Sequence, residues 1–334
     1  MKRQQKLLFI YTNLSTFVKG DLDALQPYYQ ITTSRFNLNT GKQVVLNFIK
    51  QFFWLLIHIW KFKKIYIWFG DYHSFLPVLF AKLTGKSSYL VVGGYDVCRI
   101  RSLKYGSFKN PVRGFMTRFT MQHCTLNLCV SRYVERKVKA IAPKAKTILI
   151  YNGTNLRPDK TTSLRKENIV LTVASVQSEQ TFLLKGLDRF LEAARQLPEY
   201  KFIIVGMAPK LKSLVTPLPE NITIHDKVPQ KDLIQYYQSA KVYCQLSRTE
   251  SFCMTLVEGM LYNCIPIITC VGGMPEIMGP LGYAVPENQT EKIVQAIRDA
   301  MLLPYSTAYE ERIEQHFLLS ERQEKLVNVL RQEA

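Results

Sequence analysis

Residues Ser247–Glu276 read SRTESFCMTLVEGMLYNCIPIITCVGGMPE, and this stretch decides what kind of fold the chain forms. Between its first glutamate and its last one, the only charged residue is Glu258. A carboxylate in such apolar surroundings is costly unless hydrogen bonds satisfy it. The pattern predicts a helix over Thr255–Cys264 and a buried, β-branched strand over Ile265–Cys270, with a loop on either side.

The glycine pair Gly272-Gly273 follows that strand and precedes a helix expected to start near Pro275-Glu276. In an α/β sheet, ligands bind at the loops beyond the carboxyl ends of the strands, and glycines let backbone N–H groups approach an anion. Taken singly, the features also fit a core helix with one satisfied glutamate and an ordinary Gly-Gly turn. The spacing between the glutamates and the glycine pair is therefore needed to distinguish a ligand site from core packing.

The two glutamates and the glycine pair form one spaced pattern. Glu250 is followed by Ser251-Phe252, and seven residues separate it from Glu258, which follows Leu256-Val257. The run Gly272-Gly273-x-Pro275-Glu276 continues the pattern in register. This combination resembles the signature of the family 4 (group 1) retaining glycosyltransferases.

The resemblance implies a site for a nucleotide-sugar donor. Lys185-Gly186, at the start of a predicted helix, is similar to the family's cation for the donor diphosphate, and the positive end of a helix dipole supports such a role. The implied catalytic residues are Glu250 and Lys185. The other donor-side positions are Glu258 on the ribose and the backbone of Phe252, Cys253, Met254, Thr255, Gly272 and Gly273.

One cation of the family pattern is missing from the donor side. The family has an arginine shortly after the preceding strand, where this sequence has Ser175. Arg248, two residues before Glu250, is our hypothesis for a replacement; an arginine on a surface loop is the alternative.

The acceptor side resembles the family more loosely. A His-Gly-x-Asp pattern is matched by Gly94 and Asp96, while Gly93 stands at the histidine position. Gly20 is what remains of the family's glycine-rich acceptor loop. Gly20, Gly94 and Asp96 are therefore the expected acceptor-side residues.

Apolar runs alternate with helical segments along the whole chain, which predicts a parallel α/β sheet in each half. Besides 265–270, the expected strands are 7–11, 65–69, 88–92, 126–130, 146–151, 169–174, 202–205, 222–224 and 242–246. The resemblance implies two facing Rossmann-like domains of the GT-B type, with sheets flanked by helices. We expect an acceptor-binding domain at 1–155, a linker within 156–168, a nucleotide-sugar-binding domain at 165–305, and a C-terminal helix at 306–334 that returns to the first domain.

The basic residues are concentrated in the first half of the chain. Residues 1–150 hold 24 Lys and Arg against 5 Asp and Glu, a charge of +19, whereas residues 151–334 hold 20 against 21, a charge of −1. Within 97–134 there are seven basic residues and no acidic one. The first half is therefore expected to face an anionic partner, and charge alone does not choose between nucleic acid and membrane. We expect the partner of this domain to be an anionic membrane surface, and we expect no nucleic acid.

The segment 43–64 combines large apolar residues with a polar stripe. Asn47, Lys50, Gln51, His58 and Lys61 recur at helical spacing, and most other positions are aromatic or aliphatic. The charged positions interrupt the roughly 20 apolar residues that a membrane-spanning helix needs. We prefer a helix packed on a parallel sheet, and partial insertion into a bilayer surface remains the alternative.

The seven cysteines show no Cys-x-x-Cys motif and no metal spacing, which predicts reduced thiols and a cytoplasmic chain. Only 7–11 is apolar near the N-terminus, too short for a signal peptide. No acidic cluster suits a divalent ion, so neither a metal nor a cofactor is expected apart from a UDP- or GDP-linked donor.

The predicted function is retaining transfer of a sugar to a glycan or lipid-linked acceptor, in cell-surface polysaccharide or lipopolysaccharide synthesis at the inner face of the cell membrane. Two alternatives remain. A basic nucleic-acid-binding protein would explain the charge, although no nucleic-acid-binding motif supports it. A non-catalytic GT-B-like protein would explain Gly93 and Ser175.

Overall fold

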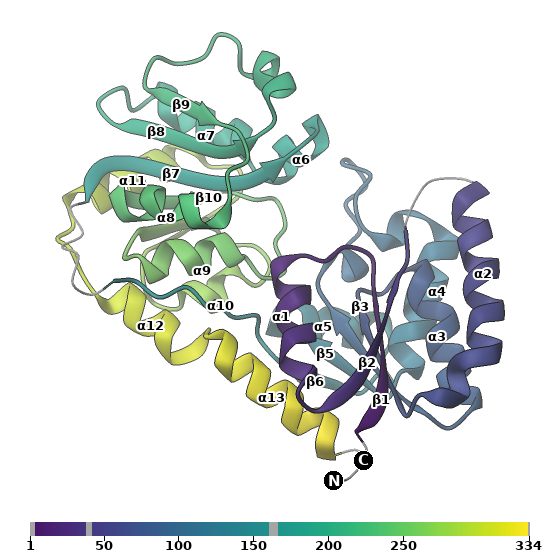
Figure 1. Ribbon diagram of the computed structural model, residues 1–334. Coiled ribbons are helices and arrows are strands. Elements are labelled where there is room, and N and C mark those ends of the chain that lie inside the picture. Colours follow the sequence, from purple (N-terminus) through teal and green to yellow (C-terminus); the bar gives the residue numbers. More distant parts are fainter. Residues whose placement is uncertain (1–3, 38–41, 160–165, 333–334) are drawn as a thin grey trace. The chain divides into compact units, whose positions relative to one another are not determined.

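The computed structural model describes residues 4–37, 42–159 and 166–332, and the chain forms two compact units (Figure 1). Unit 1 comprises the described residues up to Gly153 together with those from Leu319 onward. Unit 2 comprises the described residues from Thr154 to Leu318. Residues 160–165, within the linker expected at 156–168, lie outside the described residues.

Unit 1 is built on a six-stranded sheet in the order β2-β1-β3-β4-β5-β6, with every pair of neighbours parallel. Its central strands are continuous apolar runs, as expected for a sheet covered on both faces. The strands are β1 Gln5–Tyr11, β2 Tyr29–Arg35, β3 Lys64–Trp68, β4 Ser87–Val92, β5 Leu126–Cys129 and β6 Thr147–Leu149.

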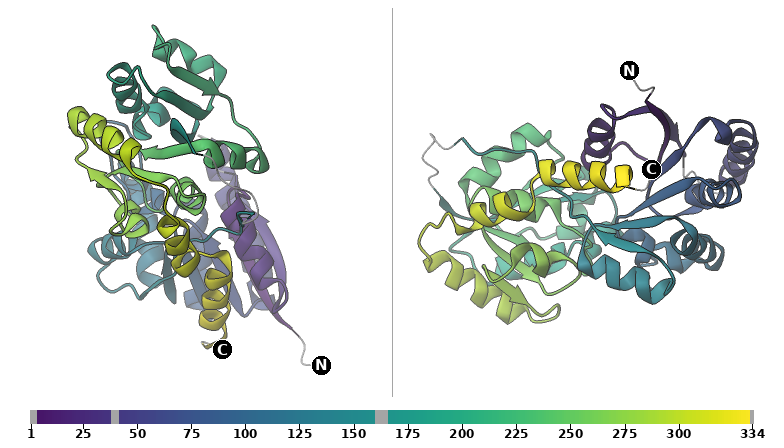
Figure 2. Two further views of the ribbon diagram at one scale, coloured as in Figure 1. Left: turned by 90° about the vertical axis from the view of Figure 1, so that its left-hand side faces the viewer. Right: turned by 90° about the horizontal axis from the view of Figure 1, so that it is seen from below.

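The helices of unit 1 form two groups. Helices α2, α3 and α4 pack in a row, and α1 packs with the C-terminal helix α13 on the other side (Figures 1 and 2). The bounds are α1 Thr16–Leu25, α2 Lys42–His58, α3 Tyr72–Leu83, α4 Pro111–His123, α5 Arg132–Ile141 and α13 Leu319–Gln332, with 3-10 helices η1 Ile59–Lys61, η2 Tyr95–Val97 and η3 Ser107–Lys109.

Unit 2 repeats this architecture with the sheet order β12-β11-β10-β7-β8-β9, again all parallel. Its strands are β7 Glu167–Val176, β8 Lys201–Met207, β9 Ile222–His225, β10 Ala240–Gln245, β11 Ile265–Thr269 and β12 Tyr283–Val285. Its helices are α6 Glu179–Leu184, α7 Leu187–Arg195, α8 Gln230–Ser239, α9 Met254–Leu261, α10 Met274–Met278, α11 Thr290–Leu302 and α12 Ala308–His316, with the 3-10 helix η4 Pro209–Val215.

The expected class, parallel α/β sheets flanked by helices, is confirmed in both units. Two strands were not expected from the sequence. β2 is an edge strand in which four of the seven residues are exposed, so it lacks an apolar run, and β12 has only three residues. The terminal helix expected at 306–334 is in two parts, of which α12 lies in unit 2 and α13 falls in unit 1.

A buried ion pair attaches α13 to the rest of unit 1. Arg322 donates hydrogen bonds to both carboxylate oxygens of Asp21, at 2.7 and 2.8 Å, and the two side chains are 1% and 0% exposed. The hydroxyl of Tyr66 donates to the same carboxylate at 2.7 Å. Arg322 also donates to the carbonyl oxygens of Ile150 and Tyr151, so helices α1 and α13, strand β3 and the segment after β6 share one polar cluster.

We predict that Arg322→Ala lowers the free energy of unfolding by about 3–5 kcal/mol, because Asp21 would remain buried without its cation. Urea denaturation followed by circular dichroism measures this. The matched control is Lys325→Ala on the same helix, whose exposed pair with Glu321 should contribute at most about 1 kcal/mol. Equal, small losses in both variants would contradict a stabilising role for the buried pair.

Candidate functional site

The expected donor-side residues gather at the carboxyl ends of β7 and β10. These strands are neighbours in the sheet, and the strand order reverses between them, since β8 and β9 lie on one side and β11 and β12 on the other. In open α/β sheets such a switch point is where ligands bind. Lys185 follows β7 through α6, and Glu250 follows β10.

Lys185 and Glu250 form an ion pair, with 2.9 Å between Nζ and Oε2. Their side chains are 26% and 14% exposed, so the pair is sheltered but reachable from solvent. Burial acts to lower the pKa of Lys185, but the Glu250 carboxylate outweighs it and the pKa is raised. Lys185 is therefore a cation throughout the neutral pH range.

Two glycines bring the ion pair together. Gly186 has a φ of +70°, and a Cβ there would overlap the carbonyl oxygen of Leu246 at the end of β10. Gly272 has a φ of +65°, and a Cβ there would overlap the carbonyl oxygen of Glu250. Only glycine accommodates both the left-handed backbone and this close approach.

The glycine loop is also hydrogen-bonded to the glutamate. The N–H group of Gly273 donates to the carbonyl oxygen of Glu250 at 2.9 Å. Gly272-Gly273, Glu250 and Lys185 therefore lie together, as the sequence pattern predicted for one site. The role of each at a donor remains a prediction.

Glu258, on α9, is buried and accepts two hydrogen bonds. The hydroxyl of Tyr237 donates to Oε2 at 2.9 Å, and Nε2 of Gln230 donates to Oε1 at 3.0 Å. Burial raises the pKa of Glu258, and these two hydrogen bonds act in the opposite direction. A carboxylate offers about four acceptor positions, so two hydroxyl groups of a ligand could still bind. Gln230 was not identified from the sequence, because a single glutamine at the start of a helix is not part of any recognisable motif.

The residues between Glu250 and α9 form the start of that helix. Phe252 and Cys253 are buried, and Cys253 is the N-cap of α9, which begins at Met254. Burial raises the pKa of Cys253 to about 12, so its thiol is neutral and not a nucleophile. Met254 and Thr255 are half-buried at the N-terminal turn, where helical N–H groups lack intrahelical partners.

Arg248 has a different partner from the one hypothesised. Its two terminal nitrogens donate to the carboxylate of Asp188 at 2.8 and 2.6 Å, and it also contacts the carbonyl oxygen of Leu183. A diphosphate would recruit this guanidinium only by breaking the pairing with Asp188. Ser175 is exposed near the end of β7, at the side of the sheet where Lys185 lies.

On unit 1, Asp96 is fully buried and organises two loops. Its carboxylate accepts hydrogen bonds from the N–H groups of Gly70 (3.0 Å), Gly93 (3.2 Å) and Gly94 (2.6 Å). Burial nevertheless raises its pKa to about 6. Asp96 thus joins the loops after β3 and β4, and its expected place on the acceptor side remains a prediction.

The histidine position of the family pattern is filled by a neighbouring ring. A Cβ at Gly93 would overlap the ring of Phe69, a non-glycine residue with a φ of +67°. Such left-handed strain tends to occur at functional sites. Gly20 is not in a loop: it lies inside α1, where an added Cβ would come within 3.3 Å of Leu319 on α13, so helix packing accounts for it.

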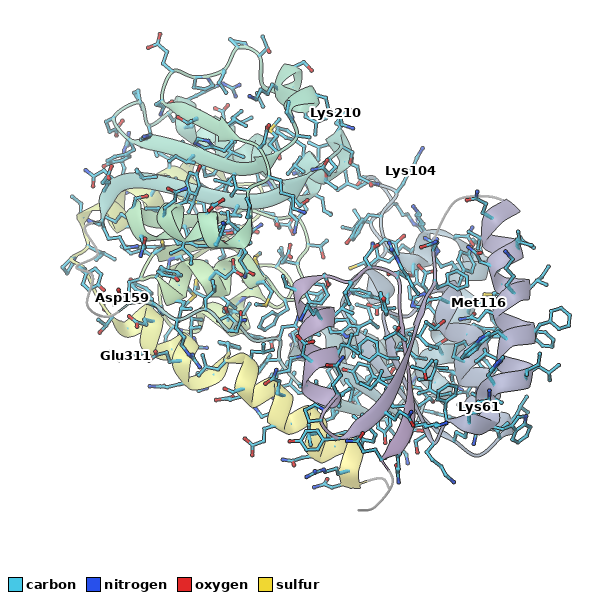
Figure 3. The ribbon with its side chains drawn as sticks, in the orientation of Figure 1. Lys61, Lys104, Met116, Asp159, Lys210 and Glu311 are labelled. Atoms are coloured by element: carbon cyan, nitrogen blue, oxygen red, sulfur yellow. The ribbon has the colours of Figure 1, made fainter. Side chains whose placement is uncertain are left out.

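The basic run 97–134 is only partly an exposed surface. Nε of Arg113 lies 3.0 Å from Oδ1 of Asp71, and a terminal nitrogen of Arg113 donates to the hydroxyl of Tyr95 at 2.7 Å. The other six are exposed: Arg99, Arg101, Lys104, Lys109, Arg118 and Arg132. Lys104 follows β4, at the carboxyl edge of the sheet, and Lys61 lies toward the opposite end of unit 1 (Figure 3).

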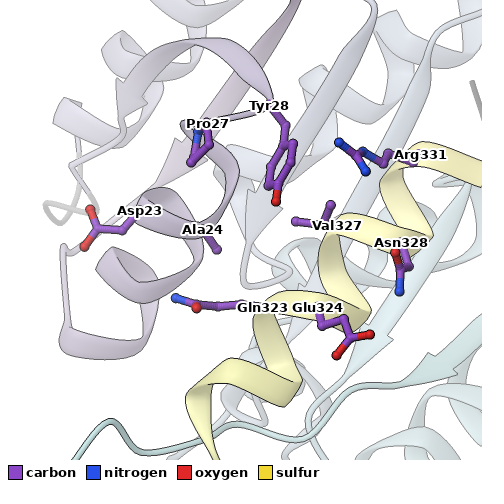
Figure 4. A pocket seen from close by; sticks show the side chains of 9 residues that line it. All are labelled: Asp23, Ala24, Pro27, Tyr28, Gln323, Glu324, Val327, Asn328 and Arg331. Carbon is purple, nitrogen blue, oxygen red and sulfur yellow. The ribbon is translucent and has the colours of Figure 1, made fainter.

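A pocket of 430 Å³ lies between α1 and α13, with Tyr28 and Arg331 among its lining side chains (Figure 4). The Arg331 guanidinium stands 4.4 Å from the centre of the Tyr28 ring. No predicted site residue lines it, so it is separate from the expected donor and acceptor positions.

Among the described residues, no three His, Cys, Asp or Glu side chains gather in a way that could hold a metal ion. The seven cysteines are reduced thiols, six of them buried and Cys270 exposed.

Residues 156–316 match the family model of glycosyl transferases group 1. A curated relative from Arabidopsis thaliana is a subunit of phosphatidylinositol N-acetylglucosaminyltransferase. It is 23% identical over 200 residues, covering 56% of this chain and 44% of that protein. The chain therefore matches less than half of that relative's length.

Solved structures resemble the chain over nearly its whole length. Sucrose-phosphate synthase from Thermosynechococcus elongatus has a TM-score of 0.81 at 16% identity, covering 98% of this chain and 99% of that one. HepE of Anabaena in complex with UDP-glucose has a TM-score of 0.73 at 13% identity, covering 98% and 100%.

We predict that Gly272→Ala destabilises the protein more than Gly85→Ala. Both glycines have a φ near +65°, and alanine there costs about 1–2 kcal/mol. Gly85 has nothing within 4 Å of an added Cβ, whereas at Gly272 the overlap with Glu250 should add roughly 1–3 kcal/mol. Urea unfolding of both variants measures the difference, and equal losses would show that the loop does not depend on this close approach.

The site geometry and the family match coincide in unit 2. The switch-point ion pair, the buried Glu258 and the glycine loop all lie within the matched residues 156–316. Over residues 156–316 the chain is similar to the glycosyl transferases group 1 family, and the chain has the GT-B fold.

Proposed function

We propose that this protein is a retaining glycosyltransferase that moves a sugar from a UDP- or GDP-linked donor to a glycan or lipid-linked acceptor. The observation that carries the proposal is the Lys185–Glu250 ion pair beside the Gly272-Gly273 loop at the switch point of a parallel sheet. The HepE structure, described as a complex with UDP-glucose, supports a nucleotide-sugar donor.

The chemistry proposed for unit 2 rests on charge. Breaking the bond between sugar and diphosphate builds negative charge on the leaving phosphate, and oriented N–H groups and a fixed cation stabilise it. Lys185 would supply the cation, and the N-terminal turn of α9 with the Gly272-Gly273 loop would supply N–H groups. We propose that these groups make a divalent ion unnecessary.

Glu250 would have two tasks in this mechanism. Without donor it holds the Lys185 ammonium in place at 2.9 Å. When a diphosphate takes over the ammonium, the Glu250 carboxylate is released toward the donor sugar, which is the role that the family resemblance implies. Glu258 would accept hydrogen bonds from the ribose hydroxyls.

The acceptor is proposed to be lipid-linked or a growing glycan, in cell-surface polysaccharide or lipopolysaccharide synthesis at the inner face of the cell membrane. The Arabidopsis relative is named for an enzyme that glycosylates a lipid, phosphatidylinositol, which supports a lipid-linked acceptor. The exposed basic residues after β4 would face an anionic part of that acceptor.

One observation favours the alternative of a GT-B-like protein without catalysis. The Phe69 ring fills the space in front of Gly93. Gly93 stands at the position of the histidine in the His-Gly-x-Asp pattern of the family that the sequence resembles. If that histidine is essential to the chemistry, this chain would bind a donor but not transfer its sugar.

The test begins with a thermal-shift screen against nucleotide sugars, followed by assays of donor hydrolysis and transfer. An α-linked donor should give an α-linked product by NMR, with activity retained in EDTA. Lys185→Ala should lower kcat/KM roughly 10- to 150-fold, the loss of one hydrogen bond to a charged group. An inverted product would overturn retention, and a loss in EDTA that Mg²⁺ restores would overturn metal independence. Donor binding without turnover would favour the non-catalytic alternative.

We predict that Glu258→Ala weakens nucleotide binding roughly 10- to 150-fold, because hydrogen bonds from two ribose hydroxyls to a carboxylate would be lost. Isothermal titration with UDP and GDP measures it, with circular dichroism to verify folding. Tyr237→Phe, which leaves the carboxylate in place, should have a smaller effect, and Glu192→Ala on the exposed part of α7 should have none. Unchanged affinity in folded Glu258→Ala would exclude the ribose role.

A further inference from the structure

Helix α2 and the following η1 expose an apolar face. Of the eighteen large apolar side chains exposed in the described part of the chain, eight lie here, each 39–68% exposed. They are Val45, Leu46, Ile49, Phe52, Phe53, Leu56, Ile57 and Trp60. At about 100° per residue they fall within an arc of about 140°, so they form one continuous face.

The opposite arc of α2 packs on unit 1. Gln51, Leu55 and Ile59 are buried, and the ring of Phe48 contacts that of Phe75 on α3. At the border between the packed side and the exposed face, the ring of Phe52 contacts that of Phe80 on α3. The preferred interpretation of 43–64 as a packed helix is therefore correct for one side only. The other side is left without a covering element in the described structure.

The sheet topology decides how this helix can meet a membrane. Gln43–Lys61 is long and apolar enough to cross a bilayer, and only 17% of its most apolar window is buried. However, β2 before the helix and β3 after it both pair with β1. A spanning helix would place these strands on opposite sides of the bilayer and break the sheet, so α2 can only lie along a surface.

Basic residues border the apolar face and carboxylates are absent from it. Lys50 and Lys61 are exposed and lie beside the face on the same edge of the helix. The five carboxylates of residues 1–150 all lie on other segments and have partners. They are Asp21 with Arg322, Asp23 with Lys19, Asp71 with Arg113, Asp96 with three backbone amides, and Glu135 with Lys139.

A pocket of 320 Å³ opens along that same basic edge, between α2 and the end of β2. Arg35 and Lys50 supply two cations to its lining, and Trp54 an aromatic wall. Gln51 also lines it and is 9% exposed; its Nε2 donates to the His73 carbonyl, while its Oε1 has no hydrogen-bond partner among the described residues. The cations of Arg35 and Lys50 suit a phosphate, and the amide oxygen of Gln51 suits a hydroxyl group. The pocket therefore fits a headgroup that contains both a phosphate and a hydroxyl.

We propose that α2 docks unit 1 on an anionic phospholipid bilayer. The helix lies in the membrane plane, and its eight exposed apolar side chains enter the acyl chains. One anionic lipid headgroup enters the pocket at Arg35, Lys50 and Gln51. The proposed partner is a bilayer because it offers acyl chains to the apolar face and anionic headgroups to the cations beside that face. Neither α2 nor η1 carries a carboxylate that would repel those headgroups. The inference concerns where the proposed reaction occurs, but its test measures binding alone, so either can fail while the other stands.

The experiment is flotation with liposomes of phosphatidylcholine alone or with phosphatidylglycerol added. The chain should float with the anionic vesicles and not with the neutral ones. Raising salt to 1 M, where the Debye length is about 3 Å, should reduce binding without abolishing it. The emission of exposed Trp60 should shift to the blue on binding, and Trp60→Phe should remove that shift.

Two variants separate the parts of the surface. The triple change Ile49→Ser, Phe53→Ser and Ile57→Ser should abolish flotation, and Arg35→Glu with Lys50→Glu should lower the partition coefficient about tenfold or more. The matched controls in unit 2 are Leu302→Ser, an exposed apolar residue, and Lys210→Glu, an exposed cation, and both should float normally.

Three results would overturn the proposal. The first is the absence of flotation with anionic vesicles. The second is flotation of the triple variant equal to that of the unchanged protein, after circular dichroism has shown that the variant is folded. The third is binding of the unchanged protein to neutral vesicles equal to its binding to anionic ones. A concentration-dependent dimer that the triple variant abolishes, without flotation, would instead assign the face to a second copy of the chain.

Discussion

Two backbone carbonyl groups at and after the end of β10, those of Leu246 and Glu250, each lie against a glycine at which an added Cβ would overlap the carbonyl oxygen. Gly186 brings the loop after α6 onto the strand end, and Gly272 brings the loop after β11 onto Glu250. Because three separate loops meet at these contacts, the Lys185 ammonium reaches the Glu250 carboxylate. The candidate donor site therefore depends on backbone packing before it depends on charge.

Three of the five carboxylates of residues 1–150 are buried inside unit 1, namely Asp21, Asp71 and Asp96, and this contributes to the character of its surface. Asp21 holds α13 through Arg322, and Asp96 holds the loops after β3 and β4. With the acids placed there, the helices on the side of α2 present cations and apolar groups without an opposing charge. The net charge of +19 in residues 1–150 is thus concentrated outside.

The parts of the fold that the sequence predicts well are those with strong local patterns. The buried strands of both sheets are apolar runs, and they match the structure to within a few residues at each end. The edge strand β2 was missed because half of its side chains face solvent, which removes the apolar run. The glutamates, Lys185 and the glycine pair were found because their types and spacing form a long pattern.

By itself, the sequence determined the two parallel sheets and the charge asymmetry, since each depends on residue type and spacing along the chain. It also predicted which residues gather around the Lys185–Glu250 ion pair. The tertiary structure alone decided which groups meet. Arg248 pairs with Asp188, Gln230 and Tyr237 bind Glu258, and Phe69 fills the space at Gly93. The hydrogen-bonded partners lie between 21 and 60 residues apart along the chain. A side chain pairs with whichever group the packing brings within hydrogen-bond distance, and the spacing of residues in the sequence carries no record of that choice.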